Sequence, residues 1–151
     1  MPKFIRQGDN TLIGNNTFSG SNTFSGTTTF SGGTVRPVTF SALVGATVVL
    51  TAANSGGVFI NRSTSGSPSW TLPAATTAGL IYTFVVSNVT AGFTVTAAGT
   101  IYAKTASTGT AISGTTLTNT QGTAVVGDTI TLVSDGAGWR MTSQSGIFAA
   151  A

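Results

Sequence analysis

The sequence predicts an all-β chain with two parts, an N-terminal segment of hexad repeats (residues 1–37) and an antiparallel β-sandwich or jelly-roll-like domain (residues 38–151). Three observations predict this class. A six-residue pattern repeats near the N-terminus. From residue 38 onward, short runs rich in Val, Ile, Thr and Phe are separated by Gly, Asn, Ser and Pro. No segment combines helical periodicity with capping residues. Many short strands with regular turn signals are typical of sandwiches and jelly rolls.

Four hexads, DNTLIG, NNTFSG, SNTFSG and TTTFSG, occupy residues 9–32. Each has one large apolar residue at its fourth position and a glycine at its last. Because six is a multiple of the two-residue side-chain period of a strand, an extended chain would direct all four apolar residues to one side. We therefore interpret each hexad as a short strand and a corner, as in β-solenoids and intertwined β-stems. The four apolar residues are Leu12, Phe18, Phe24 and Phe30.

The number of hexads predicts a homotrimer. A three-sided β-helix uses about three hexads per turn and needs about three stacked repeats for stability, so four hexads in one chain are too few. Three chains that each contribute one hexad per layer would form a trimeric β-stem with four apolar layers. A flexible Gly/Ser/Thr linker and an extended arm lying on another surface are the alternatives. The regularly placed phenylalanines favour the stem, because a linker needs no aromatic residue.

The remainder of the chain predicts a series of short strands. The clearest signal is a C-terminal hairpin, in which residues 128–133 pair with 139–143 across a turn that contains Asp135 and Gly136. Residues 105–123 are small and polar, and we expect them to form an exposed excursion with one short strand. The expected strands are 38–42, 47–52, 57–61, 69–72, 80–87, 93–97, 100–104, 115–118, 124–126, 129–133 and 139–142.

Charge is unusually sparse in this chain. Only 6% of the residues are charged, with six bases against three acids, whereas ordinary domains contain about 25%. A surface of Thr, Ser, Gly and Asn suits tight subunit packing. The bases are not clustered beside aromatic residues, so we expect no nucleic-acid partner. No apolar run reaches the roughly 20 residues of a membrane span, and the N-terminus lacks a secretory signal. We therefore expect a soluble protein made in the cytoplasm, with no membrane partner.

The residue types argue against an enzyme. The chain contains no His, Cys or Glu, which removes Ser-His-Asp and Cys-His arrangements and histidine-bearing zinc sites. Asp128 and Asp135 could act as paired carboxylates in glycoside chemistry or could collect a Ca²⁺ ion. We interpret them instead as the start of a strand and a turn residue. The sequence therefore predicts no catalytic residues, no cofactor and no metal.

Two tryptophans are the candidates for ligand contact, because aromatic side chains stack on sugars. We expect Trp70 and Leu72 to face opposite ways, so that one of them is exposed; Trp70 is thus a candidate ligand contact. Trp139 begins the last predicted strand in phase with Met141, which favours core packing. Arg140, on the opposite face, is expected to be solvated or to contact another subunit.

The order of strand and turn segments in residues 46–143 resembles that of β-sandwich modules in virion proteins of tailed bacteriophages. Such modules occur in capsid cement (head decoration) proteins and in fibre-type proteins. The resemblance rests on a Thr-Leu-Pro strand, a loop of small residues, a long apolar strand and a final hairpin of the form GD-x-[IV]-x-L-x-SDG-x-x-W. The hexads resemble repeats in trimeric phage stems. The resemblance of residues 46–143 to these modules is carried by VVLTAANSGGVFINRS (48–63), TLPAATTAGLIYTFVVSN (71–88), FTVTAAG (93–99) and AVVGDTITLVSDGAGWRM (124–141).

This resemblance implies a trimeric structural protein of the virion surface, and the short chain favours a cement protein over a long fibre. We expect the trimer to bind the major capsid protein on the outer surface of the shell and to stabilise it. The N-terminal tip, with Lys3, Phe4 and Arg6, is the candidate capsid contact. Two alternatives stay open. A short tail-fibre or spike module would recognise host-surface glycans through Trp70 and residues 105–123, and a surface-layer or filament subunit would assemble without closure.

Overall fold

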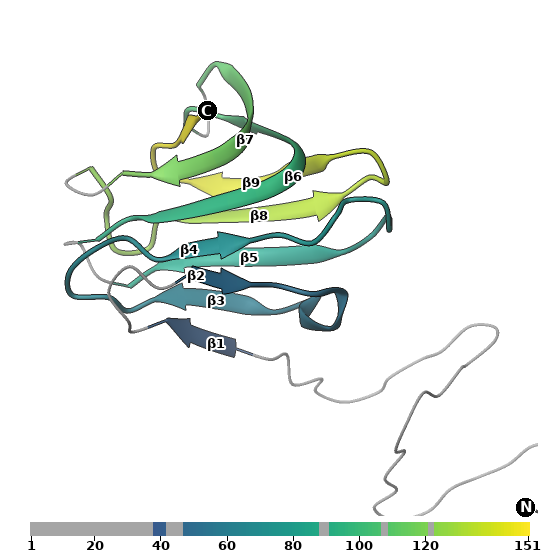
Figure 1. Cartoon of the computed structure of the whole chain (residues 1–151). Helices are drawn as coiled ribbons and strands as arrows, with labels where there is room; N and C mark the ends of the chain where they lie inside the picture. The colour runs from purple at the N-terminus through teal and green to yellow at the C-terminus, as the bar shows by residue number, and fades with distance from the viewer. Residues whose placement is uncertain (1–37, 42–46, 88–90, 107–108, 121–122) are drawn as a thin grey trace, which may run out of the picture. The chain divides into compact units, whose positions relative to one another are not determined.

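The structure is a computed structural model that describes residues 38–41, 47–87, 91–106, 109–120 and 123–151 (Figure 1). The chain divides into two units, Met1–Thr34 and Val35–Ala151. The described residues all belong to the second unit, which we call the head. The hexads, and with them the predicted stem, lie outside the described residues.

The described residues of the head form strands and one short 3₁₀ turn, η1 (Ala52–Asn54), so the domain is all-β, as the fold class predicts at this coarse level. Its strands form one ten-stranded sheet. Their bounds are β1 Val38–Ser41, β2 Thr47–Val49, β3 Val58–Asn61, β4 Ser69–Thr71, β5 Ile81–Val86, β6 Phe93–Lys104, β7 Ala111–Asn119, β8 Thr129–Ser134, β9 Trp139–Ser145 and β10 Ala149–Ala150.

The sheet consists of two parallel stacks joined by an antiparallel hairpin. Strands β1, β3 and β5 pair in parallel, and so do β2, β4 and β6. The chain alternates between the stacks, so β1–β2, β3–β4 and β5–β6 form three successive coils, as in a short β-solenoid. The hairpin β8–β9 connects β5 to β6, which gives the strand order β1-β3-β5-β8-β9-β6-β4-β2. Figure 1 shows the resulting curled sheet.

The expected antiparallel sandwich is therefore wrong in its strand pairing, because the sheet is mixed. The residue pattern could not reveal this difference. In either kind of ladder alternate side chains point to opposite faces, so the same sequence of apolar and polar residues fits both. What decides the pairing is the route of the connections between strands, which carries no local signal in the sequence.

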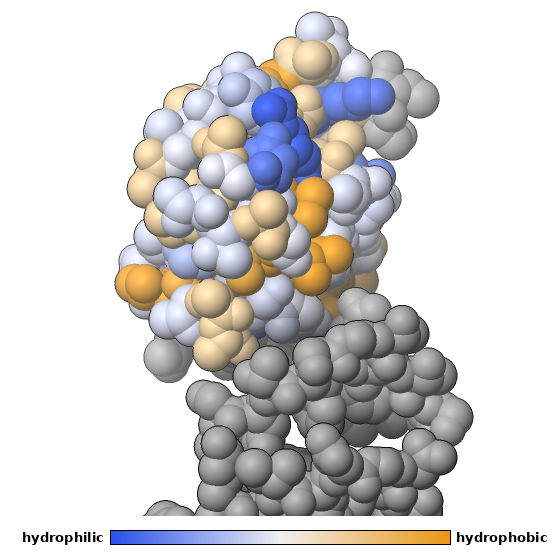
Figure 2. Space-filling view, turned by 90° about the vertical axis from the view of Figure 1, so that its right-hand side faces the viewer, coloured by the Kyte–Doolittle hydropathy of each residue, from blue (hydrophilic) through white to orange (hydrophobic). Residues whose placement is uncertain are grey.

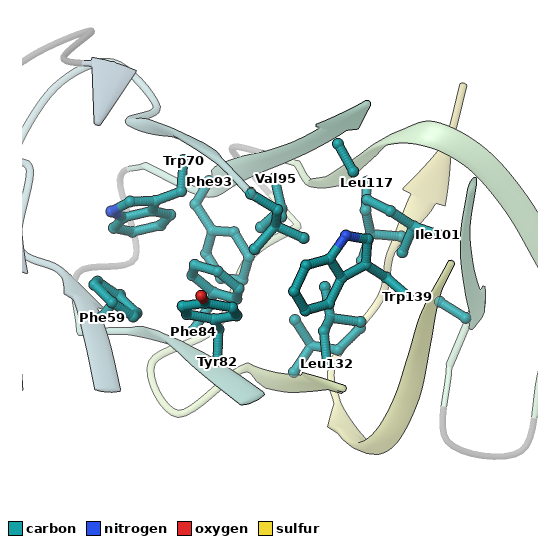
Figure 3. Packing of buried hydrophobic residues seen from close by; sticks show 14 of the residues in the cluster. Phe59, Trp70, Tyr82, Phe84, Phe93, Val95, Ile101, Leu117, Leu132 and Trp139 are labelled. Atoms are coloured by element: carbon teal, nitrogen blue, oxygen red, sulfur yellow. The ribbon is translucent and has the colours of Figure 1, made fainter. Parts of the chain in front are cut away.

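An aromatic core fills the space between the two stacks. The rings of Phe59 on β3, Trp70 on β4 and Phe84 on β5 lie together, with centroid distances of 5.6 Å from Phe59 to Phe84 and 5.2 Å from Trp70 to Phe84. Tyr82 on β5 contacts Trp139 on β9 at 5.4 Å and links this group to the aliphatic residues under the hairpin (Figure 3). Burying each such side chain contributes about 1.5–3 kcal/mol, so these rings hold the stacks together.

Alternate residues of β5 and β6 point into the core, as in a half-buried sheet. Tyr82, Phe84 and Val86 are all buried, and so are Phe93 and Val95. The predicted hairpin is confirmed, because β8 and β9 pair antiparallel across the turn with Asp135.

Two expectations about the C-terminal half are wrong. Within residues 105–123 the strand is longer than the expected 115–118: β7 spans nine residues and pairs antiparallel with β6 and with the terminal strand β10. Residues 124–126 lie in the turn that leads to β8 and form no strand. Most positions of β7 are exposed or half-buried. Its side chains are therefore small and polar, a composition that is also typical of a loop.

Candidate functional site

The predicted residues of the stem and of the capsid contact lie outside the described part of the chain. Their placement therefore stays a prediction from the sequence. These residues are Leu12, Phe18, Phe24 and Phe30 of the stem, and Lys3, Phe4 and Arg6 of the N-terminal tip.

Trp70 is not exposed, so its prediction as a ligand contact is wrong. Its side chain is fully buried, between Phe59, Phe84 and Phe93. Leu72 is also buried. Residues two apart in an extended chain point to the same side, so both turn inward, contrary to the expectation that they face opposite ways. Trp139 is buried, as predicted.

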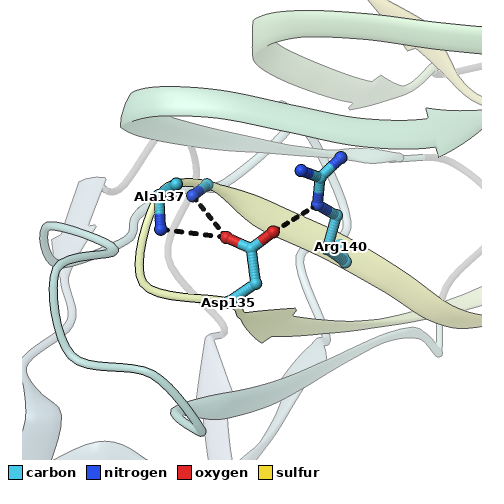
Figure 4. A network of polar contacts seen from close by, with 4 residues as sticks. Asp135, Ala137 and Arg140 are labelled. Atoms are coloured by element: carbon cyan, nitrogen blue, oxygen red, sulfur yellow. Dashed lines mark hydrogen bonds and ion pairs between the residues drawn. The ribbon is translucent and has the colours of Figure 1, made fainter.

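Asp135 organises the turn between β8 and β9. Its Oδ1 atom accepts hydrogen bonds from the backbone N–H groups of Ala137, at 2.9 Å, and Gly138, at 2.7 Å (Figure 4). Aspartate commonly stabilises turns by accepting from backbone groups two or three residues ahead. Its role as a turn residue is therefore confirmed, and both carboxylate oxygens are held in fixed positions.

Arg140 is paired with this carboxylate and stacked on an aromatic ring. Its Nε donates to Oδ2 of Asp135 at 2.6 Å, and its Cζ lies 3.8 Å from the ring centroid of Tyr102. The parallel pairing of β6 with β9 places Tyr102 directly beside Arg140. A Cβ atom on Gly138 would come within 3.2 Å of the Tyr102 ring, so the absent side chain there makes room for the ring. We call these three residues, Tyr102, Asp135 and Arg140, the Arg140 cluster.

The electrostatics of the Arg140 cluster favour the charged forms of both partners. The hydrogen bond from Arg140, followed by those from the backbone of Ala137 and Gly138, holds the pKa of the Asp135 carboxyl well below its ordinary value of 3.8. The hydrogen bond to Asp135 raises the pKa of Arg140 above its ordinary value. The cluster is therefore a persistent ion pair at the surface, with side chains 46% and 35% exposed for Arg140 and Asp135.

Asp128 lies at the opposite end of β8 and has a structural role. It is buried, and its Oδ2 accepts hydrogen bonds from Asn119 Nδ2 at 2.9 Å and from the backbone N–H of Val125 at 3.0 Å. A six-residue strand separates it from Asp135, a span of roughly 20 Å at about 3.3 Å per residue. Paired catalytic carboxylates lie about 5–10 Å apart, so these two aspartates cannot act together on a glycoside or a metal ion.

Three exposed aliphatic residues lie on the segments that the hydrogen bonds of Asp128 and Asn119 join. Val125, Val126 and Ile147 are 59%, 57% and 59% exposed. They are held near one another because Asn119 donates to both Asp128 and the Ile147 carbonyl oxygen, at 2.9 and 3.2 Å, while Asp128 accepts from Val125. We call Val125, Val126 and Ile147 the apolar tip.

The apolar tip and the Arg140 cluster lie at opposite ends of the strands. Residues 125–126 shortly precede the start of β8, and Asp135 follows its end. Because β8 runs antiparallel to β5, and β5 runs parallel to β3 and β1, the Arg140 cluster lies at the end where β1 begins. Figure 2 faces the end with the β8–β9 turn and shows strongly hydrophilic residues only in its upper part, on an otherwise pale to apolar surface.

Comparison of the sequence with known protein families and with curated proteins finds no match. Within the described ranges, no helix is long and apolar enough to cross a bilayer. The same residues contain no group of three or more Asp, Glu, His or Cys side chains that could hold a metal ion. The two surfaces described above, the Arg140 cluster and the apolar tip, are the candidate functional sites.

Proposed function

We propose that this protein is a structural component of a bacteriophage virion, a homotrimer that binds the outer surface of the capsid and stabilises the shell. The major capsid protein would be its partner. The hexad segment would trimerise and contact the shell, and the heads would contribute to the trimer. The proposal combines the resemblance of residues 46–143 and of the hexads to virion proteins with the surface chemistry of the head.

The apolar tip is the observation that carries the proposal. Its three aliphatic side chains stand on turns fixed by the buried pair Asp128 and Asn119, so the tip is a defined surface. Grouped exposed apolar side chains mark contact sites between proteins. In a threefold ring the interfaces join different patches of neighbouring copies, but residues that lie beside the axis meet their equivalents from the other two copies. The apolar tip therefore fits a contact between heads of a trimer.

Multivalency gives the mechanism. Each chain would make a shallow contact with a coat subunit, and trimerisation would join three such contacts into one binding event with a far longer lifetime. Bound across the seams between coat subunits, a trimer would have to release several contacts before the shell could open. The sparse charge of the chain, 6% of residues, suits such close packing because neighbouring trimers repel one another little.

The glycan-recognition alternative loses support from the structure. Trp70, its main candidate residue, is buried, and the part of residues 105–123 that forms β7 pairs with β6. A glycan site would now need a different aromatic platform. The exposed Tyr102 is a poor one, because Arg140 covers one face of its ring and Gly138 approaches it closely.

The proposal is tested by heating particles with and without the protein. Particles that carry it should release their genome at a higher temperature than particles that lack it, and re-adding purified trimer should restore the difference. The matched variant is Ile147→Asp, which places a charge in the apolar tip, with Val49→Asp as the control at a strongly exposed aliphatic residue of β2. We expect Ile147→Asp to shift the protein from trimer toward monomer in light scattering and to lose the protection. Equal rupture temperatures with and without the wild-type protein would refute the proposed function.

A further inference from the structure

The guanidinium of Arg140 is restrained by two contacts at the surface of the head. It stacks on the Tyr102 ring at 3.8 Å, and its Nε donates to Asp135 at 2.6 Å. Asp135 is itself fixed by two backbone N–H groups. A free arginine side chain loses considerable rotamer entropy on binding, whereas this one is already ordered. The Arg140 cluster is thus preorganised for an interaction that its own contacts do not complete.

The part of the guanidinium that is still free to bind a ligand is the edge with the two terminal nitrogens, Nη1 and Nη2. Among the described residues, Arg140 donates a hydrogen bond only through Nε, so Nη1 and Nη2 remain available, and the side chain is 46% exposed. Figure 4 shows both terminal nitrogens directed away from Asp135. Two parallel N–H groups on a planar cation match the two oxygens of a carboxylate, and such bidentate pairs are among the strongest hydrogen-bonded contacts in proteins.

A single carboxylate fits this edge better than a polyanion. Asp135 lies on the other side of the guanidinium and compensates its charge, so a phosphate dianion or a nucleic-acid backbone would meet repulsion as well as attraction. Lys104, two residues after Tyr102 on β6, is the nearest additional base along the strand, which is too few for a nucleic-acid surface. With phosphate and nucleic acid disfavoured, the ligand that fits best is a carboxylate, a monoanion whose two oxygens lie in one plane.

The carboxylate is best supplied by a different protein. The chain has three acidic residues, of which Asp128 is buried and Asp135 is already paired. A second copy could therefore offer only the side chain of Asp9. We propose that the Arg140 cluster is a docking site for an Asp or Glu side chain of a partner protein. The identity of that partner, a coat subunit, rests on the proposed function. The chemistry of the ligand, a carboxylate, rests on the geometry of the Arg140 cluster alone.

The chemistry is tested without any virion, by NMR titration of the full-length protein with N-acetyl-glutamate amide. N-acetyl-glutamine amide, which has the same shape without the charge, is the control probe. We expect saturable shifts of the backbone N–H resonances of Ala137 and Gly138, which every variant retains, with the glutamate probe, with a Kd on the order of 10 mM, as suits one charge-assisted contact. Arg140→Lys keeps the charge and loses the planar fork, so binding should weaken at least tenfold. Arg62→Lys makes the same change elsewhere and should leave it unchanged.

A second variant guards against misfolding of the first. Tyr102→Leu removes the stacking surface and should weaken probe binding severalfold while the thermal transition stays within a few degrees of the wild type. Equal shifts with the glutamine probe, or full binding by Arg140→Lys, would overturn the docking site.

The partner is tested with particles stripped of the protein. Arg140→Lys should occupy fewer sites than Arg62→Lys at equal concentration. If no variant, wild type included, binds particles while the glutamate titration succeeds, the proposed function fails and the carboxylate site stands. If Asp9→Asn lowers particle binding as much as Arg140→Lys and the two changes are not additive, the carboxylate comes from a second copy, and the assignment to a different protein is wrong.

Discussion

Replacement of Trp70 by alanine should strongly destabilise the head. The side chain is fully buried, with ring centroids 5.2, 5.5 and 6.4 Å from those of Phe84, Phe93 and Phe59. It contacts both parallel stacks, so its removal leaves a cavity that neither stack can fill alone. Substitutions of this kind cost about 3–5 kcal/mol, which is a large share of the stability of a domain of this size.

The phenylalanine variant separates the ring from the indole N–H. The Nε1 atom of Trp70 is buried without a hydrogen-bond partner among the described residues. Trp70→Phe keeps an aromatic ring in the stack and removes this unsatisfied donor, whose burial is itself unfavourable. The two effects oppose each other, so we expect Trp70→Phe to cost about 1 kcal/mol, well below the alanine variant.

Urea unfolding monitored by circular dichroism measures both variants. Val49→Ala, at a residue that is 69% exposed, is the control and should stay within about 0.5 kcal/mol of the wild type. Emission of the wild-type protein should also be blue-shifted and resist quenching by iodide, because both tryptophans are buried. A Trp70→Ala variant as stable as Val49→Ala would refute the buried position of Trp70 and restore it as a candidate ligand contact.

Four further substitutions test other parts of the head by the same unfolding assay. Gly146→Ala should cost at least about 2 kcal/mol, because its φ is +98° and a Cβ would come within 2.3 Å of a buried carboxyl carbon. Gly79→Ala, with φ +87° and no atom within 4 Å, should cost only about 1 kcal/mol, and equal losses would contradict the steric argument. Asn61→Ala should cost about 3 kcal/mol by leaving two carbonyls and one N–H unpaired. The folded pKa of Asp135 is lowered, so its contribution is complete above about pH 4 and is lost as the pH falls through the folded pKa. Asp135→Asn should therefore flatten the acid limb of the stability curve, and an unchanged limb would contradict the ion pair.

Local patterns predicted the elements of the head better than their arrangement. The β8–β9 hairpin was predictable because Asp135 and Gly136 supply a turn between two alternating runs, and turn chemistry is local. The parallel stacks were not predictable, because alternation alone does not distinguish the two kinds of ladder. Trp70 was misplaced through its assumed relation to Leu72, although both point inward as residues two apart must.

The candidate sites show the same division. Arg140 was expected at the surface and Asp135 in the turn, and both are found there. Their association with Tyr102 depends on the parallel register of β6 with β9, two strands that are far apart in the sequence. The apolar tip depends on Asp128 and Asn119, whose contact joins the end of β7 to the start of β8. Contacts of this kind arise from tertiary structure, so residue spacing in the sequence does not predict them.

The most direct test of the proposed function is the copy number of this protein relative to the major coat protein in purified particles. A trimer that covers the shell predicts hundreds of copies per particle, in a simple ratio to the coat subunits. A few to a few dozen copies would contradict a cement role and would indicate a fibre or spike.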